Sequence, residues 1–108
     1  MNKGMIGVLI AVMLTARAGV FQNGSTGLTE TWYNLPMRNV VQKAQDAGIP
    51  CEYWVRDDGI KMFGPWVIVA SHPAKTRFSF VETSRGTGII LDRHTVDDTE
   101  LIDIAAEW

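Results

Sequence analysis

Two aspartates near the C-terminus have the residue type and spacing needed for acid–base chemistry. Asp92 ends the apolar run 88–92, and Asp103 lies 11 residues further on, inside a second apolar run, 101–105. Short apolar runs bounded by turn-forming residues are typical of buried strands. Two strands that bring these carboxyl groups together would pair a proton-carrying acid with a neighbour that raises its pKa. Aspartates that only hydrogen-bond the loops would be structural, and the sequence leaves both readings open.

Other polar combinations fit known sites less well. His72 and His94 with Asp92 match no metal-ligand spacing, so we expect no metal site there and no cofactor. Ser71, His72 and Asp92 lack the glycines of a nucleophile elbow. Cys51 follows a proline at the predicted helix exit and is best interpreted as a small buried residue. His94, between acidic residues, is expected to be a solvated side chain.

Acidic and aromatic residues supply two weaker candidates. The segment 97–100, which holds Asp97, Asp98 and Glu100, reads as a solvated acidic loop, although a cation site there stays open. Four tryptophans are many for this length, and most should pack in the core or at the barrel ends. Trp54 flanks a predicted hairpin and is our candidate for stacking on a sugar ring.

Composition limits the classes of function. A chain of 108 residues has room for one domain, and its 46% hydrophobic content is that of a globular protein. The formal net charge of -2, with no basic patch, gives no electrostatic basis for binding nucleic acid. The single cysteine excludes an internal disulfide and a cysteine-based zinc site. The oligomeric state cannot be inferred.

The N-terminus has two interpretations. Lys3 precedes the apolar run 5–14, and Ala-Arg-Ala at 16–18 has the form of a cleavage site, so an export signal is predicted. The run of 10 residues is too short to span a bilayer as a helix, so no stable membrane span is expected. Alternatively, 14–21 is the first strand of the domain. We therefore predict a leader over 1–13, a single barrel domain over 14–108, and a secreted or cell-envelope location, with a cytoplasmic or phage-associated location as the alternative.

One helix is predicted, over about 35–47. Apolar residues recur there at helical spacing, and Asn34 is placed to cap the helix ahead of Pro36. Gly48 is suited to the left-handed position after the helix, and Pro50 prevents its continuation.

The rest of the chain reads as short strands. Strands are predicted over 30–33, 52–57, 60–63, 66–70, around 78–83, 88–92 and 101–105. Asp58-Gly59 predicts a two-residue hairpin turn between the second and third of these. The run 66–70 is continuously apolar, as in a strand buried on both faces. We therefore expect a mainly β fold, a small barrel of six to seven strands with one α-helix.

The segments GTGIILD (86–92) and DIAAEW (103–108) resemble the closing half of double-psi β-barrel domains of bacterial cell-wall proteins. These are the three-aspartate domain, the lytic transglycosylase A family and, more distantly, rare lipoprotein A and the expansins. Asp92 matches the second aspartate of the three-aspartate pattern and Asp103 the third. His72 or Ser71 stands where the first aspartate would be. The pattern departs after Asp92, where Arg-His-Thr replaces Thr-Gly-Gly and removes glycines that let backbone approach a sugar.

The resemblance implies a peptidoglycan-cleaving activity. In lytic transglycosylases one acid protonates the glycosidic oxygen and then, as a base, helps the sugar's own hydroxyl close an anhydro ring. The resemblance implies that Asp103 is this acid/base and that Asp92 is the neighbour that raises its pKa and orients substrate. His72, Arg93 and His94, with Trp54, are then the substrate-binding residues, and the partner is peptidoglycan or another glycan. The alternatives are a non-catalytic barrel module that binds glycan or protein, and a phage-encoded accessory domain.

Overall fold

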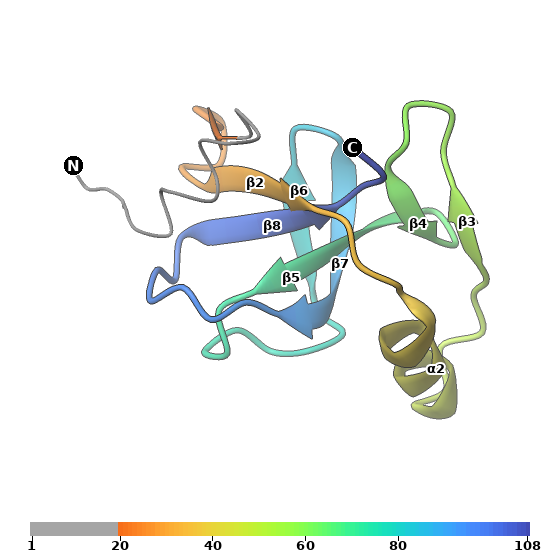
Figure 1. Cartoon of the computed structure of the whole chain (residues 1–108). Helices are drawn as coiled ribbons and strands as arrows, with labels where there is room; N and C mark the ends of the chain where they lie inside the picture. Colours follow the sequence, from red (N-terminus) through yellow and green to blue (C-terminus); the bar gives the residue numbers. More distant parts are fainter. Residues whose placement is uncertain (1–19) are drawn as a thin grey trace.

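The computed structural model describes residues 20–108, and it contains eight strands and one short helix (Figure 1). The strands are β1 (Phe21–Gln22), β2 (Thr29–Tyr33), β3 (Tyr53–Val55), β4 (Lys61–Phe63), β5 (Trp66–Ser71), β6 (Phe80–Thr83), β7 (Gly86–Arg93) and β8 (Leu101–Ala105), and the helix is α2 (Arg38–Asp46). The expected mainly β, barrel-like fold with one helix is confirmed, with one strand more than the upper end of the prediction. The predicted leader, 1–13, and most of the predicted first strand, 14–21, lie outside the described residues.

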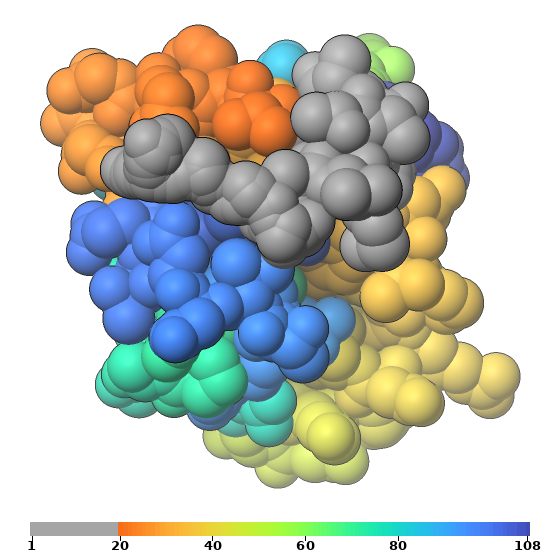
Figure 2. All heavy atoms as spheres, turned by 60° about the vertical axis from the view of Figure 1, so that its left-hand side comes forward, coloured from red at the N-terminus to blue at the C-terminus, as the bar shows by residue number. Residues whose placement is uncertain are grey.

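All eight strands belong to one mixed sheet whose centre is β5. The strands follow one another in the order β1-β2-β8-β5-β4-β3, and β7 pairs with the other edge of β5 and carries β6. β5 runs parallel to β7 and antiparallel to β4 and β8, and β2 runs parallel to β8. In Figure 1, β2 and β8 lie side by side and cross β6 and β7 at a steep angle. Figure 2 shows the β1–β2 region in orange and the β7–β8 loop in blue on one face.

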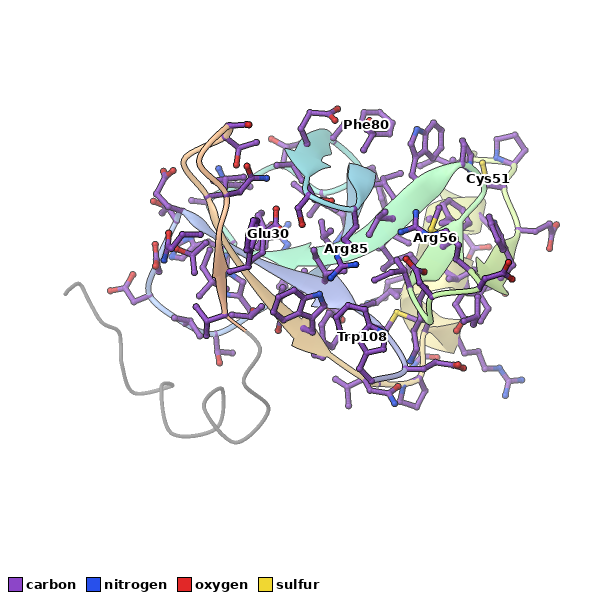
Figure 3. All side chains as sticks on the ribbon, turned by 90° about the horizontal axis from the view of Figure 1, so that it is seen from above. Glu30, Cys51, Arg56, Phe80, Arg85 and Trp108 are labelled. Atoms are coloured by element: carbon purple, nitrogen blue, oxygen red, sulfur yellow. The ribbon has the colours of Figure 1, made fainter. Side chains whose placement is uncertain are left out.

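Trp108, near the end of the described chain, packs against residues of other segments (Figure 3). Its ring centroid lies 5.4 Å from that of Trp32, and the Arg85 guanidinium lies 5.0 Å from the Trp108 centroid on the ring face. The indole N–H donates to the carbonyl oxygen of Asp58 at 2.7 Å. These two tryptophans therefore pack against each other, while Trp108 remains 48% exposed.

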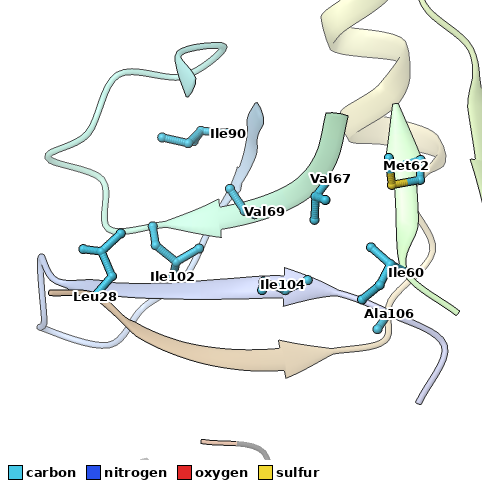
Figure 4. Close-up of a cluster of buried hydrophobic side chains, with 9 residues drawn as sticks. All are labelled: Leu28, Ile60, Met62, Val67, Val69, Ile90, Ile102, Ile104 and Ala106. Carbon is cyan, nitrogen blue, oxygen red and sulfur yellow. The ribbon is translucent and has the colours of Figure 1, made fainter. Parts of the chain in front are cut away.

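Two hydrophobic clusters lie on opposite faces of the sheet. The first fills the inside of the curled strands and consists of Leu28, Ile60, Met62, Val67, Val69, Ile90, Ile102, Ile104 and Ala106 (Figure 4). The second lies between the sheet and α2 and consists of Met37, Val41, Ala44, Phe63, Ile68, Ile89, Leu91 and Ala105. β5 contributes to both clusters, which explains its continuous apolar sequence.

The helix ends where the sequence predicts but starts later. Gly48 has φ 100° and follows the last turn, as expected. The N-cap position is occupied by Met37, without a side-chain cap hydrogen bond. The predicted cap, Asn34, instead accepts a hydrogen bond from Lys61 Nζ at 2.6 Å. The helix therefore depends on its buried face, which includes Val41 and Ala44, more than on a capping side chain.

The β3–β4 connection has a three-residue loop, not the predicted two-residue turn. Val55 pairs with Lys61, and Arg56 N donates to the Ile60 carbonyl oxygen at 2.8 Å, which leaves residues 57–59 in the loop. Gly59 has φ 87°, the left-handed conformation that such a loop requires at its last position. No helix within residues 20–108 is long and apolar enough to cross a membrane.

Candidate active site

Asp92 and Asp103 lie on the same face of the sheet, on either side of Ala70. Ala70 of β5 pairs with Asp92 of β7 on one side and with Asp103 of β8 on the other, and Asp103 pairs with Thr31 of β2. Paired residues of neighbouring strands present their side chains on one face, and two strand spacings separate the aspartate Cα atoms by roughly 10 Å. Both aspartates are half-buried. The row Thr31–Asp103–Ala70–Asp92 is the candidate site.

A β-bulge brings Asp92 to this face. Val69 pairs with Ile90, but the next residue of β5, Ala70, pairs with Asp92, so Leu91 is an extra residue in β7. Without the bulge, Leu91 would oppose Ala70 and Asp92 would point to the other face, because side chains alternate along a strand. Bulges often re-aim a side chain next to a functional site. The bulge thus places the second carboxyl group beside the first.

Tyr33 is a hydrogen-bond partner of Asp92, and the sequence did not single it out. Its hydroxyl donates to Asp92 Oδ2 at 3.3 Å. Burial raises the pKa of Tyr33 well above its ordinary value, and the negative charges of Asp92 and Asp103 raise it further. The hydroxyl therefore stays protonated and acts as a donor. The only sequence signal for it was its position two residues beyond Thr31, on the same face of β2.

Small residues let the Tyr33 ring reach Asp92. Tyr33 pairs with Ala105 of β8, and β8 and β5 separate it from the strand that carries Asp92. Ala105 and Ala70 offer only methyl groups on this face, and both are buried. A larger side chain at either position would occupy the path of the ring. Thr31, in the same strand as Tyr33, donates its hydroxyl to Asp103 Oδ1 at 2.8 Å.

His94 is buried beside the site, and the expectation of a solvated side chain is wrong. It is 8% exposed, and its Nε2 lies 2.8 Å from the Leu101 carbonyl oxygen. That contact assigns the proton to Nε2, because a carbonyl can only accept. Burial lowers the pKa of His94, which favours the neutral ring. His94 therefore fixes the β7–β8 loop to the start of β8, and it is placed as a structural anchor of the site.

His72 and Arg93 lie near the row and hold the neighbouring loop. His72 Nδ1 accepts from the Ala74 N–H at 3.0 Å, and its Nε2 is 3.5 Å from Asp97 Oδ1. Arg93 Nη1 donates to the Pro73 carbonyl oxygen at 2.9 Å. Figure 2 shows the segment after β5, in teal, beside the β7–β8 loop in blue. These contacts join the two loops that flank the aspartates.

Trp54 is the predicted site residue that the structure places elsewhere. It lies on β3, and β4 separates β3 from β5 in the sheet. β4 pairs with β5 at Trp66 and Val67, whereas the aspartates pair with Ala70, near the other end of β5. Its ring is 45% exposed, and its N–H donates to the Gly64 carbonyl oxygen at 2.7 Å. Trp54 is exposed, as stacking requires, but it does not share the row with the carboxyl groups.

Within residues 20–108, no group of three or more histidine, cysteine, aspartate or glutamate side chains is arranged to hold a metal ion. No family model, no curated protein and no solved structure matches the chain.

Proposed function

We propose that this chain is a bacterial cell-wall-associated domain that cleaves peptidoglycan in the manner of a lytic transglycosylase. The observation that supports it is the placement of Asp92 and Asp103 on one face, on either side of Ala70. The residues that resemble the three-aspartate and lytic transglycosylase A domains include both of these aspartates. A pair of carboxyl groups in different hydrogen-bonding surroundings is suited to distinct acid and base roles.

In the proposed reaction Asp103 is the general acid/base. Its carboxyl group protonates the glycosidic oxygen as the bond from the anomeric carbon breaks. The resulting carboxylate then takes the proton of the same sugar's primary hydroxyl, whose oxygen bonds to the anomeric carbon and closes the anhydro ring. No water is consumed, and Asp103 ends in its starting protonation state. This reaction needs one proton-shuttling carboxyl group, in contrast to hydrolysis by two flanking carboxyl groups.

Asp92 is the neighbour that keeps the site negatively charged. A carboxylate close to Asp103 favours the protonated form of the acid, because like charges disfavour one another. It also stabilises the positive charge that develops on the sugar ring in the transition state. Both Asp92 oxygens are engaged, Oδ1 by the Arg93 backbone N–H at 2.9 Å and Oδ2 by Tyr33. Asp92 is thus oriented by the protein before substrate binds.

Digestion of purified peptidoglycan tests the proposal. The wild type, Asp103→Asn and Asp92→Asn are incubated with sacculi, and soluble products are analysed by mass spectrometry for anhydro-sugar ends. Asp57→Asn is the matched control, because Asp57 is an exposed aspartate in the β3–β4 loop. We expect anhydro products from the wild type and the control, and a loss of about 100-fold or more with Asp103→Asn.

The products separate the proposal from its rivals. Reducing ends without anhydro rings would show hydrolysis and contradict the mechanism. Sacculi that retain the wild-type protein but release no soluble fragments would identify a glycan-binding module. If the wild-type protein neither binds nor cleaves sacculi, the cell-wall assignment is wrong.

A further inference from the structure

We propose that Tyr33 is the positioning residue of this site: its hydroxyl donates to Asp92 and holds that carboxyl group on the face of the sheet that it shares with Asp103. The inference rests on the proposed function, because it assigns Tyr33 a part in that reaction. Tyr33 is not placed on the substrate, and it acts through Asp92.

The first support is the arrangement of donors on β2. Thr31 and Tyr33 are two residues apart and project from the same face of the strand, so each delivers a hydroxyl to the row. Thr31 donates to Asp103 at 2.8 Å, and Tyr33 donates to Asp92 at 3.3 Å. One strand therefore supplies a separate donor to each carboxyl group. This division allows the two aspartates to have different surroundings although they lie on one face.

The second support is the charge around the Tyr33 hydroxyl. The group is buried, and both aspartates are close enough for their charges to act on it. Losing the proton would place a negative charge beside the Asp92 carboxylate, so the hydroxyl does not serve as a base. It is the donor in its contact with Asp92. Hydrogen bonds to ionised acceptors are stronger than neutral ones.

The third support is the packing that fixes the ring. Tyr33 packs against the hydrophobic cluster that α2 covers, and it pairs with Ala105. The ring is positioned by these apolar contacts and not by the hydroxyl. Replacing Tyr33 with phenylalanine therefore keeps the packing and removes only the donor. The separation of 3.3 Å is longer than the usual limit of about 3.0 Å for a hydroxyl donor, and hydrogen bonds at catalytic sites are often long before substrate binds.

The test compares Tyr33→Phe with a matched tyrosine variant. Tyr53 is 40% exposed on β3, away from the row, so Tyr53→Phe is the control. For Tyr33→Phe we expect a melting temperature close to that of the wild type, kcat on peptidoglycan fragments lowered about tenfold, KM nearly unchanged and a displaced pH–rate profile. Tyr53→Phe should change none of these. Unaltered kcat and pH profile in Tyr33→Phe would overturn the inference while leaving the proposed function intact.

Two readouts do not depend on activity. In carbon-detected NMR, the side-chain carboxyl signals of Asp92 and Asp103 should move in Tyr33→Phe, and that of Asp57 should not. In the Tyr53→Phe variant, whose one remaining tyrosine is Tyr33, tyrosinate absorbance should appear only when alkali unfolds the protein. If the wild type does not cleave peptidoglycan, these measurements still decide whether Tyr33 is a protonated partner of the aspartates. Stationary carboxyl signals, or a tyrosinate in the folded protein, would refute it.

Discussion

The Glu30 carboxylate on β2 is hydrogen-bonded to Ser84, 54 residues away in the turn between β6 and β7. Oε2 accepts the Ser84 backbone N–H at 2.8 Å, and Oε1 accepts its hydroxyl. Asn23 donates its side-chain amide to Oε2 at 3.0 Å. Glu30 is fully buried, and β2 and β6 are not neighbours in the sheet. This carboxylate therefore links parts of the curled sheet that backbone pairing leaves apart.

Loss of this link should weaken the whole domain. We expect Glu30→Ala to lower the free energy of unfolding by about 2–4 kcal/mol, because it leaves the Asn23 amide and the Ser84 N–H without their acceptor. Urea denaturation followed by circular dichroism gives the value. Glu82→Ala is the control, since Glu82 is an exposed glutamate on β6, and its effect should stay within about 0.5 kcal/mol. Equal losses in the two variants would show that the network adds no stability.

Stability should decrease as the solution becomes acidic, through His94. Burial lowers the pKa of His94 in the folded protein, and the positive charge of His72 lowers it further, against the opposing effects of the Leu101 carbonyl and Asp98. The unfolded chain, whose histidines titrate near 6.5, then binds the proton more readily than the folded chain. The contribution of neutral, buried His94 to the free energy of unfolding is therefore present above about pH 6.5, and it is lost as the pH falls below that value.

His94→Gln isolates this effect. The glutamine amide nitrogen corresponds in position to the histidine Nε2, so it keeps an N–H for the Leu101 carbonyl oxygen but does not titrate. Unfolding free energies measured from about pH 7.5 to about pH 5 should fall less steeply in the variant than in the wild type. Parallel curves for the two proteins would mean that His94 does not carry the pH dependence.

Gly59 should tolerate no side chain. It has φ 87°, and a Cβ there would lie 2.9 Å from Trp108 Nε1, which donates to the carbonyl oxygen of the preceding Asp58. We expect Gly59→Ala to lower the unfolding free energy by about 1–2 kcal/mol, from backbone strain and displacement of the indole. Gly24→Ala is the control, because its Cβ would meet nothing within 4 Å. A change in the tryptophan emission of the folded protein should accompany the loss in Gly59→Ala and be absent in Gly24→Ala, because only the first variant displaces Trp108.

Two strands of the site could be predicted from the sequence, because a strand that is buried on both faces has a nearly continuous apolar sequence. The runs 66–70 and 101–105 are apolar enough to predict buried strands, and both are present as β5 and β8. The helix also follows from its apolar periodicity, since Val41 and Ala44 fall on the face that packs against the sheet. Each of these elements follows from the hydrophobic pattern within one segment, and such a pattern can be recognised from the sequence alone.

The features that shape the site depend on non-local contacts. The bulge at Leu91 decides which face Asp92 occupies, yet nothing in the run 88–92 distinguishes a bulged strand from a regular one. Tyr33 meets Asp92 although β8 and β5 lie between their strands in the sheet. His94 is buried because its loop folds back onto Leu101, although the surrounding residues are acidic. Each of these three features depends on contacts between segments that are distant in the sequence. No single segment of the sequence indicates such contacts.

The role of Asn34 also depends on a non-local contact, its hydrogen bond with Lys61. It is suited by type to cap the helix, but its side chain accepts a hydrogen bond from the buried Lys61 on β4, whose Nζ also donates to the Leu35 carbonyl oxygen at 2.7 Å. Asn34→Ala should therefore cost about 1–2 kcal/mol of unfolding free energy, because a buried ammonium loses an acceptor. In a Lys61→Met background the same change should cost little, since the group that needed the acceptor is gone. A cost that persists in the Lys61→Met background would show that Asn34 does not stabilise the fold through its hydrogen bond with Lys61. Asn39→Ala, at an exposed helical position, should cause no loss, because alanine favours the helix.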